Sequence, residues 1–386
     1  MLKKTVTWLM AFLLLLLGVR ITDAYAEDIP AAAQTIPNTQ DYETNAKAAV
    51  VIDAQTGRVL FAQNANLHLP MASTTKIMTA LLTLEQEGLD EYFTVDSAAI
   101  HVEGSSMGLR EGDSVSLRAL AFGMLLASGN DGANAAAVRI AGTYKKFAEM
   151  MNNRAAEIGM ENTNFVTPSG LDDPQHYSTA YDMALLAREA LLNSDFAGIC
   201  SQSKAVMAYG SPPYNRWLTN HNRLLKTYEG TVGVKTGFTK AAGRCLVSCA
   251  QRGGDRLITV TLNCPDDWNV HANLYDRYFG LLSPTDIEHI IPKVEVPVAG
   301  GAQPKVAAHF DPPTQVSLMH GEGLSTSVTA APFLYAPVVK GQVIGNVKVY
   351  CDNQHIAEVP LTAAENVAAF KQEKQSWVSW LFGWCS

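Results

Sequence analysis

The sequence predicts an α+β fold followed by a small all-β domain. Segments of β-type composition lie at both ends of a long middle region with helical periodicity, so we expect one antiparallel sheet built from the two ends of the first domain. From about residue 284 the composition changes to short β-type runs, which predict the second domain. The expected strands of the first sheet are residues 47–53, 58–63, 231–236, 242–250 and 256–264.

The N-terminus has the pattern of an export signal. Lys3 and Lys4 precede a short apolar core, and Ala24-Tyr25-Ala26 forms a small-x-small cleavage site. The apolar core is short for a membrane span, which favours cleavage over an uncleaved anchor. We therefore expect residues 1–26 to be a signal peptide of an exported protein, and residues 27–44 to be a flexible leader.

Composition argues against some classes of function. The net charge is −8 and there is no basic stretch, which argues against a nucleic-acid partner. The six cysteines show no disulfide framework, and Cys245, Cys249 and Cys264 fall in an expected hairpin where none faces another. We therefore expect buried free thiols. No histidine is spaced to complete a metal site with them, so we expect no metal.

The first domain should span residues 45–283. Its middle has apolar residues at helical spacing, and one more helix should close the domain after the last strand. The expected helices are residues 74–87, 117–127, 131–141, 144–158, 179–192 and 268–279.

The second domain should span residues 291–362 as a small β-sandwich-like unit. It has no catalytic set of residues that we can identify, so we expect it to act as a spacer or stalk. The expected strands are residues 294–298, 306–310, 315–319, 325–329, 343–350 and 356–359.

The residues from Pro70 to Leu82 should run from a loop into a helix. Ser73 lies near the first turn, and Lys76 falls on the same helix face three residues later, so Lys76 Nζ can reach Ser73 Oγ. A lysine whose pKa is lowered by burial or by a neighbouring cation can take the serine proton and create a nucleophile. Taken alone, the stretch fits a helix cap beside a surface lysine better.

Two further triplets change this interpretation. Ser128-Gly129-Asn130 lies between two expected helices, and Lys235-Thr236-Gly237 opens a strand-like stretch. Taken singly, the first could be a plain turn and the second a strand-end charge. Together with serine-x-x-lysine, in this order, they match the motif set of β-lactamases and penicillin-binding proteins, except that Gly129 stands where that set has aspartate.

The flanking sequences resemble the serine-type D-alanyl-D-alanine carboxypeptidases, the low-molecular-mass penicillin-binding proteins, in which Ser-Gly-Asn is the usual second motif. The resemblance is good over residues 45–285 and weaker beyond them. It implies a β-lactamase/transpeptidase-like fold for the first domain. The segments that carry it are residues 69–79, 103–111, 127–134, 165–173 and 230–238.

The resemblance implies acyl transfer through a serine ester. Ser73 Oγ would attack the carbonyl of a terminal D-Ala–D-Ala bond, Lys76 would accept its proton, and Ser128 would relay a proton to the leaving D-alanine. Asn130 would hold the amide oxygen of the substrate and fix Lys76. This chemistry requires no metal or organic cofactor.

The third motif is expected to bind the substrate. Lys235 supplies positive charge near the free carboxylate of the substrate and helps to keep Lys76 neutral by repulsion. Thr236 can donate a hydrogen bond to the same carboxylate, and Gly237 lets the substrate backbone lie against the strand edge.

The oxyanion hole should consist of the backbone N–H groups of Ser73 and, by resemblance, of Phe238. Residues 264–269, which follow the last strand, lack the arginine that we would look for there as a second carboxylate ligand. His221 is flanked by two asparagines, but nothing in the motif set requires it.

Three functions compete. A D-alanyl-D-alanine carboxypeptidase would act on peptidoglycan stem peptides and be acylated by β-lactam antibiotics. A class A β-lactamase would need a glutamate-activated water for deacylation, and no glutamate lies in a recognisable loop of that kind between Ser128 and Lys235. A non-enzymatic protein of the same fold conflicts with the complete set of motif residues.

Residues 363–386 predict an amphipathic helix with lysines beside its apolar face. The apolar run is too short to cross a bilayer, and tryptophan prefers the interface, so we expect the helix to hold the exported protein to the outer face of the membrane. The alternative is a helix that docks on the β domain. The apolar face would comprise Phe370, Trp377, Trp380, Leu381 and Trp384.

Overall fold

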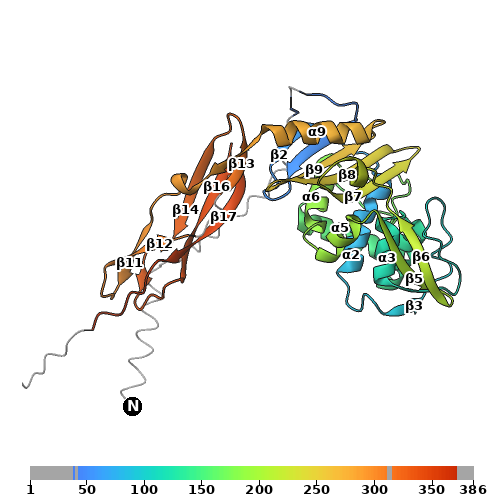
Figure 1. Cartoon of the computed structure of the whole chain (residues 1–386). Coiled ribbons are helices and arrows are strands. Elements are labelled where there is room, and N and C mark those ends of the chain that lie inside the picture. Colours follow the sequence, from blue (N-terminus) through green and yellow to red (C-terminus); the bar gives the residue numbers. More distant parts are fainter. Residues whose placement is uncertain (1–37, 40–41, 311–314, 372–386) are drawn as a thin grey trace, which may run out of the picture. The chain divides into compact units, whose positions relative to one another are not determined.

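The computed structural model describes residues 38–39, 42–310 and 315–371 (Figure 1). The centre of the first domain is a five-stranded antiparallel sheet in the order β2-β1-β9-β8-β7. Because β1 pairs with β9, the two ends of the domain meet in one sheet, which confirms the predicted α+β fold. The strands are β1 (Ala48–Asp53), β2 (Val59–Gln63), β7 (Thr231–Thr239), β8 (Gly243–Arg252) and β9 (Asp255–Leu262).

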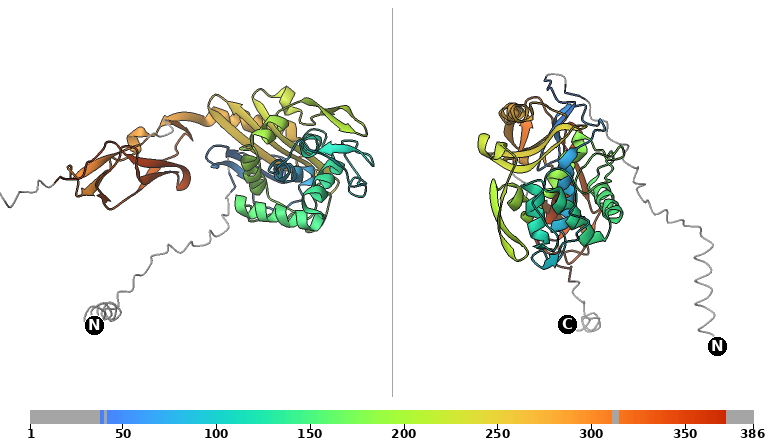
Figure 2. Two further views of the ribbon diagram at one scale, coloured as in Figure 1. Left: turned by 90° about the horizontal axis from the view of Figure 1, so that it is seen from below. Right: turned by 90° about the vertical axis from the view of Figure 1, so that its right-hand side faces the viewer.

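Both faces of this sheet are buried. Along β1, Val50 and Ile52 join the core formed with the helical layer, whereas Ala49 and Val51 pack on the side of α9 (Asp267–Leu281). This alternation follows from the two-residue period of a strand. Figures 1 and 2 show α9 along one face and the helical layer on the other. That layer comprises α2 (Lys76–Leu84), α3 (Leu117–Leu125), α4 (Asn130–Ala141), α5 (Tyr144–Ile158), α6 (Ala180–Ala190) and α7 (Ser194–Cys200).

The middle region also contains elements that the sequence analysis missed. A 3-10 helix, η1 (Ala72–Thr75), precedes α2, so the expected helix begins with a tighter turn. A four-stranded sheet in the order β3-β4-β5-β6 flanks the helical layer, and a short helix α8 (Leu224–Thr227) follows it. Its strands are β3 (Tyr92–Thr94), β4 (Ser114–Ser116), β5 (Lys204–Gly210) and β6 (Pro213–Thr219).

The second domain is all-β, as predicted. It has its own hydrophobic cluster, which runs in sequence from Ile287 to Val367. A two-stranded ladder pairs β10 (Leu282–Asp286) with β13 (Gln315–Met319). The remaining strands form a sheet in the order β14-β16-β17-β12-β11-β15, comprising β11 (Glu295–Ala299), β12 (Lys305–His309), β14 (Leu324–Ala330), β15 (Leu334–Tyr335), β16 (Val343–Cys351) and β17 (Gln354–Ala363).

The structure corrects the expected leader at its C-terminal end. Thr39 N donates to Ala62 O at 2.7 Å, and the ring of Tyr42 packs edge-on against Phe61. These contacts hold the end of the expected leader against β2, because the backbone and an aromatic ring there find partners on the domain. The expected signal peptide and the leader as far as residue 37 lie outside the described residues.

The expected C-terminal helix cannot begin at residue 363. Strand β17 continues to Ala363, Val367 and Ala369 form bridges with Val338 and Gly301, and Phe370 N donates to Gly300 O at 2.8 Å. The backbone of this segment is therefore paired with neighbouring strands, which prevents helical hydrogen bonds. Residues 372–386, with the three tryptophans, lie outside the described residues.

The cysteines and the helices of the described residues can also be compared with the sequence. The described cysteines are buried and free, as expected, and Cys249 faces Ile258 across the β8–β9 hairpin. Among the residues that the structure describes, no helix is both long enough and apolar enough to span a bilayer. The free cysteines are Cys200, Cys245, Cys249, Cys264 and Cys351.

Candidate active site

Lys76 and Ser73 form the centre of the site. Ser73 lies in η1, and Lys76, the first residue of α2, is fully buried. Its Nζ lies 2.8 Å from Ser73 Oγ, 2.7 Å from Asn130 Oδ1 and 2.6 Å from Ser169 O. Burial, and then the charge of Lys235, lower the pKa of Lys76 well below its ordinary value. In the neutral amine, two N–H groups can donate to Asn130 and Ser169, which leaves the lone pair for the proton of Ser73.

Ser128 lies in the turn between α3 and α4. Its φ of 57° lies in the left-handed region of the backbone, which residues other than glycine rarely adopt. Lys235, 1% exposed on β7, donates from Nζ to Ser128 Oγ at 3.0 Å and to Thr236 O at 2.8 Å. Burial lowers the pKa of Lys235 to about 7. The second and third motifs are thus joined by a direct hydrogen bond.

Asn130 connects Lys76 to a loop that precedes the second motif. Its Nδ2 donates to Glu103 O at 2.6 Å, and its backbone N–H donates to Ser105 O at 2.7 Å. The side-chain oxygen that faces Lys76 is fixed by the first of these bonds, since the amide group cannot rotate without losing it, and the second bond holds the backbone of Asn130. The loop at residues 103–109 therefore sets the orientation of Asn130.

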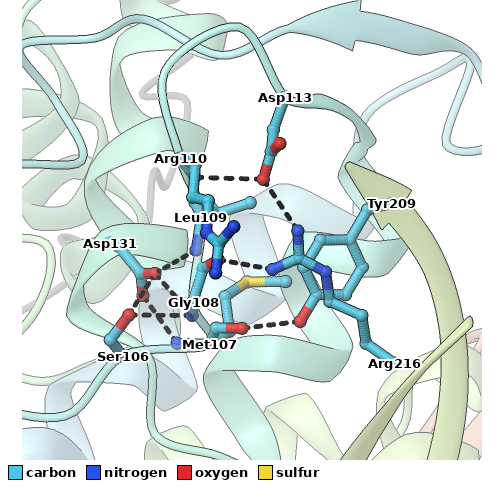
Figure 3. A network of polar contacts seen from close by, with 9 residues as sticks. All are labelled: Ser106, Met107, Gly108, Leu109, Arg110, Asp113, Asp131, Tyr209 and Arg216. Carbon is cyan, nitrogen blue, oxygen red and sulfur yellow. Dashed lines mark hydrogen bonds and ion pairs between the residues drawn. The ribbon is translucent and has the colours of Figure 1, made fainter. Parts of the chain in front are cut away.

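The carboxylate of Asp131 holds this loop to the start of α4 (Figure 3). Asp131 is 2% exposed, and it accepts hydrogen bonds from the backbone N–H groups of Met107, Gly108 and Leu109 at 2.9–3.0 Å. Ser106 Oγ donates to it at 2.6 Å. With Gly132 N as a fifth donor at 2.9 Å, this buried carboxylate is well compensated for its loss of water.

The β5–β6 hairpin supports the other side of the same loop. Arg216 on β6 donates to Gly108 O and, at 3.0 Å, to Asp113 Oδ2. Its guanidinium lies 4.3 Å from the ring centre of Tyr209, whose hydroxyl donates to Met107 O at 2.6 Å. Figure 3 shows these groups gathered around the loop. The hairpin missed by the sequence analysis is therefore part of the support for the second motif.

Strand β7 lies close against η1. A methyl group added at Gly237 would lie 3.0 Å from Met71 O and 3.1 Å from Ser73 N. Only glycine allows this approach without a shift of the backbone. Phe238, whose N–H is the expected second oxyanion donor, follows Gly237 on the strand and exposes 65% of its surface.

The loop formed by residues 165–176 contacts both Lys76 and the residue before Ser73. It supplies Ser169 O, and a methyl group on Gly170, whose φ is 82°, would lie 2.0 Å from Ala72 O. His176 Nε2 lies 2.8 Å from Thr75 Oγ1, and its Nδ1 accepts from Val166 N at 2.9 Å. Burial lowers the pKa of His176 to about 4, so the ring is neutral and Nε2 donates to Thr75.

In the sequence analysis, the loop at residues 165–176 contributed only to the family resemblance, and its contact with Lys76 was not predicted. A Ser-Gly pair in a loop gives no signal of contact with a lysine that is far away in the sequence. The glycine is specified by a distant carbonyl, which becomes visible only when the fold is known.

A cleft of about 400 Å³ opens over Ser73. Among the expected residues, it is lined by Ser73, Ser128, Thr236, Gly237 and Phe238, whereas Lys76, Asn130 and Lys235 are buried. Its lining also contains residues that the sequence analysis missed or left without a role. These are Ser105, His221, Arg223, Arg244, Asp267 and Trp268.

One group of three potential metal ligands lies close together within the described residues. It comprises Glu322, Cys351 and Asp352 of the second domain, and none of these lines the cleft.

The chain is similar to known proteins along most of its length. The family described as D-alanyl-D-alanine carboxypeptidase matches residues 33–266, and the C-terminal domain of penicillin-binding protein 5 matches residues 289–369. D-alanyl-D-alanine carboxypeptidase DacF of Bacillus subtilis is 31% identical over 87% of this chain and 89% of its own length. D-alanyl-D-alanine carboxypeptidase DacC of Escherichia coli is 33% identical over 87% of both chains. The crystal structure of penicillin-binding protein 5 from Haemophilus influenzae superposes with a TM-score of 0.67 at 28% identity, covering 86% of this chain and all of that one.

Proposed function

The chain belongs to the D-alanyl-D-alanine carboxypeptidase family, and from this premise we propose that Ser73 removes the terminal D-alanine from a peptidoglycan stem peptide through an acyl-enzyme. The protein is a serine-type peptidase of the low-molecular-mass penicillin-binding group. The observation that carries the proposal is the fully buried Lys76 amine 2.8 Å from Ser73 Oγ.

The acylation step begins with Lys76. Its neutral amine takes the proton of Ser73 Oγ as the oxygen attacks the carbonyl carbon between the two D-alanines. The negative charge that develops on the carbonyl oxygen is stabilised by the N–H groups of Ser73 and Phe238. Such donors contribute on the order of 3–4 kcal/mol each.

The leaving D-alanine needs a proton when the bond breaks. Ser128 Oγ can deliver it, and the proton that Lys76 took from Ser73 replaces it, so Lys76 is neutral again; Lys235 Nζ donates a hydrogen bond to Ser128 Oγ at 3.0 Å. Water then attacks the carbonyl of the serine ester, Lys76 accepts a proton from this water, and the proton passes to Ser73 Oγ as the ester bond breaks. The acid product keeps the hydroxyl of the water, and Ser73 and Lys76 return to their starting protonation states.

Substrate orientation follows from the same groups. Asn130 holds the amide oxygen of the penultimate residue, and Gly237 leaves room for the peptide along the edge of β7. Thr236 and Lys235 receive the terminal carboxylate. A β-lactam presents a strained amide in the same position, and its opened ring remains attached, so the ester should be long-lived.

Penicillin and a D-Ala-D-Ala peptide together test the proposal. Intact-mass spectrometry should show one penicilloyl adduct that persists, and the peptide should release D-alanine. Ser73→Ala should show neither, with a rate loss on the order of 10⁶. Rapid penicillin turnover without an adduct would favour a β-lactamase, and an adduct that persists in Ser73→Ala would exclude Ser73 as the nucleophile.

We further propose that the mature protein acts outside the cytoplasm and binds the membrane surface through residues 372–386. The support is in the sequence: a signal-type N-terminus, and Trp377, Trp380 and Trp384 at helical spacing. A truncation after Lys371 would spare the strand pairing of Phe370. The full mature chain should sediment with anionic liposomes and the truncated chain should not, and equal partition of the two would contradict the anchor.

A further inference from the structure

The carboxylate end of the cleft contains an arginine that the sequence analysis did not find. Residues 264–269 lack an arginine, but Arg244 lines the same cleft together with Asp267 and Trp268. We propose that the guanidinium of Arg244 binds the free carboxylate of the terminal D-alanine and so makes the enzyme select peptides with a free C-terminus. This inference rests on the function proposed above.

The register of the sheet explains how Arg244 reaches the cleft. Arg244 on β8 is the cross-strand partner of Phe238 on β7, and Leu246 is the partner of Thr236. Residues directly opposite one another in an antiparallel pair point to the same face, and so do residues two apart. Arg244, Thr236 and Phe238 therefore lie on one face, and the arginine side chain lies beside the carboxylate ligands expected from the third motif.

The start of α9 holds the guanidinium in place. Arg244 donates from Nε at 3.1 Å and from Nη2 at 2.7 Å to Asp267 Oδ1, and the group lies 5.3 Å from the ring centre of Trp268. Asp267 is 2% exposed, whereas the Arg244 side chain is 40% exposed. Nη1 has no partner among the described residues. A guanidinium fixed on one side and open on the other loses little entropy when it binds a carboxylate.

The contacts of Lys235 favour a second cation near the substrate carboxylate. Its Nζ already donates to Ser128 and Thr236, and burial lowers its pKa to about 7, so near neutral pH it carries only part of a full charge. Arginine remains charged at any pH at which the protein is folded. Arg244 can therefore supply a constant positive charge where Lys235 cannot.

Arg223 is the competing candidate. It also lines the cleft, but its side chain has no hydrogen-bond partner within the part of the chain that the structure describes, and the residue is exposed. An unanchored arginine must lose more side-chain entropy on binding. We therefore assign the carboxylate to Arg244, and Arg223→Gln becomes one arm of the test.

The test compares two forms of one peptide, acyl-D-Ala-D-Ala with a free C-terminus and the same peptide as its C-terminal amide. Arg244→Gln should lower kcat/KM for the free acid by about 10- to 100-fold, mostly through KM, and should change the amide little. The preference of the enzyme for the free acid should shrink by the same factor. If the glutamine variant does not fold, Arg244→Lys should show a smaller loss in the same direction.

Arg252→Gln is the matched control. Arg252 is also on β8, pairs with Asp276 of α9 and stacks on Phe279, but it does not line the cleft. Arg252→Gln should leave the preference unchanged, and thermal unfolding of both variants measures the structural cost. Asp267→Asn, which keeps the cation but weakens its anchor, should raise KM for the free acid less than Arg244→Gln does.

An unchanged ratio between acid and amide in Arg244→Gln would overturn the assignment, as would a loss of that ratio in Arg223→Gln alone. Both results leave the Ser73 acyl-enzyme intact, because penicillin still reports it. A native protein that neither releases D-alanine nor forms the Ser73 adduct would overturn the proposed function, and the role of Arg244 with it.

Discussion

Lys76 shows how one residue acquires a chemical role from its surroundings. It is buried, and no carboxylate of the described residues lies within hydrogen-bonding distance; its three hydrogen-bond contacts are a hydroxyl, an amide oxygen and a backbone carbonyl. Burial disfavours the ammonium form, and the nearby Lys235 adds repulsion. The amine is therefore available as a base under conditions in which an exposed lysine is protonated.

The pH dependence of acylation tests this role. The neutral base is lost as pH falls through the lowered pKa of Lys76, so the penicillin acylation rate should decline on the acid side, tenfold per pH unit at its steepest. Charge on Lys235, with its pKa of about 7, is lost as pH rises, which should weaken substrate binding on the alkaline side. Lys76→Arg should be nearly inactive because guanidinium stays protonated. A rate that does not vary from mildly alkaline to mildly acidic pH would contradict the assignment.

Gly170 provides a second test at the scale of a single residue. An added methyl group at Gly170 would meet Ala72 O at 2.0 Å, so Gly170→Ala must displace the residue before the nucleophile. We expect a stability loss greater than the cost of positive φ, and acylation slowed by about 100-fold. Gly159→Ala is the control, because Gly159 has a similar φ of 87° with open space around it.

Gly159→Ala should cost only about 1–2 kcal/mol and leave acylation unchanged. Denaturant unfolding and the penicillin acylation rate are measured for both variants. Equal stability losses with normal acylation in Gly170→Ala would mean that the contact with Ala72 does not position Ser73.

The residues of the site were accessible to sequence reasoning to different degrees. Ser73 and Lys76 are three positions apart, so helical geometry alone predicts their contact, and the 2.8 Å distance agrees with it. Arg244 was missed because its place in the cleft depends on the register between two strands. The hairpin pattern contained that signal, since pairing residue 239 with residue 243 puts Arg244 opposite Phe238.

At the scale of an element, the loop at residues 103–109 depends on α4. The loop has no regular structure, and three of its backbone N–H groups, those of residues 107–109, donate to the single carboxylate of Asp131. The same loop fixes Asn130 through Glu103 O and Ser105 O. The first turn of α4 and the loop are therefore one structural unit. A substitution that disturbs either should shift Asn130 and so weaken its contact with Lys76.

Asp131→Asn tests this dependence. Asparagine lacks one acceptor oxygen, so it leaves buried backbone N–H groups unpaired, at a cost of about 3 kcal/mol. We expect slower acylation by penicillin as well as lower stability, measured by intact mass and by denaturant unfolding.

Asp182→Asn is the control for this variant. Asp182 on α6 is also buried and accepts from Asn162 N and Thr163 Oγ1, but it lies outside the cleft. It should lose stability without a change in acylation rate. Normal acylation in Asp131→Asn would show that the loop does not control the second motif.

Elements with a buried apolar face were predicted well, and exposed ones were missed. The expected helix at residues 144–158 has the same bounds as α5, because Phe147, Met151 and Ala155 recur at helical spacing and are buried. The β5–β6 hairpin was missed because β6 is exposed along most of its length and shows no apolar alternation. Its role depends instead on Arg216, and a single arginine carries no strand signal.

At the scale of the whole molecule, two buried histidines make the first domain sensitive to acid. His271 lies between α9 and the sheet, where it hydrogen-bonds Ser248 and Thr261. His176, in the loop at residues 165–176, hydrogen-bonds Thr75. Burial lowers the pKa of His271 to about 3 and that of His176 to about 4, whereas both should be near 6.5 in the unfolded chain. At pH values between the folded and the unfolded pKa of each histidine, the unfolded state therefore binds more protons than the folded state.

The contribution of these histidines to the free energy of unfolding should be complete above pH about 6.5. Below that pH, the free energy of unfolding should fall by about 1.4 kcal/mol per histidine and pH unit. The free energy of unfolding from denaturant titrations at several pH values measures this slope. His271→Gln should flatten the dependence even if it lowers stability, whereas the exposed His68→Gln should not. A slope that His271→Gln leaves unchanged would mean that other groups cause the acid sensitivity.

The buried cysteines can serve as native probes of local unfolding in this protein. Burial raises the pKa of Cys245 and Cys249 to about 12 and that of Cys264 to about 11, so these thiols should be inert toward alkylating reagents in the closed structure. Labelling can then proceed only during transient exposure, and its rate at each site reports how often that region opens. Cys351 samples the second domain separately from the other four. Peptide mapping over time could thus resolve the breathing motions of the two domains without any introduced label.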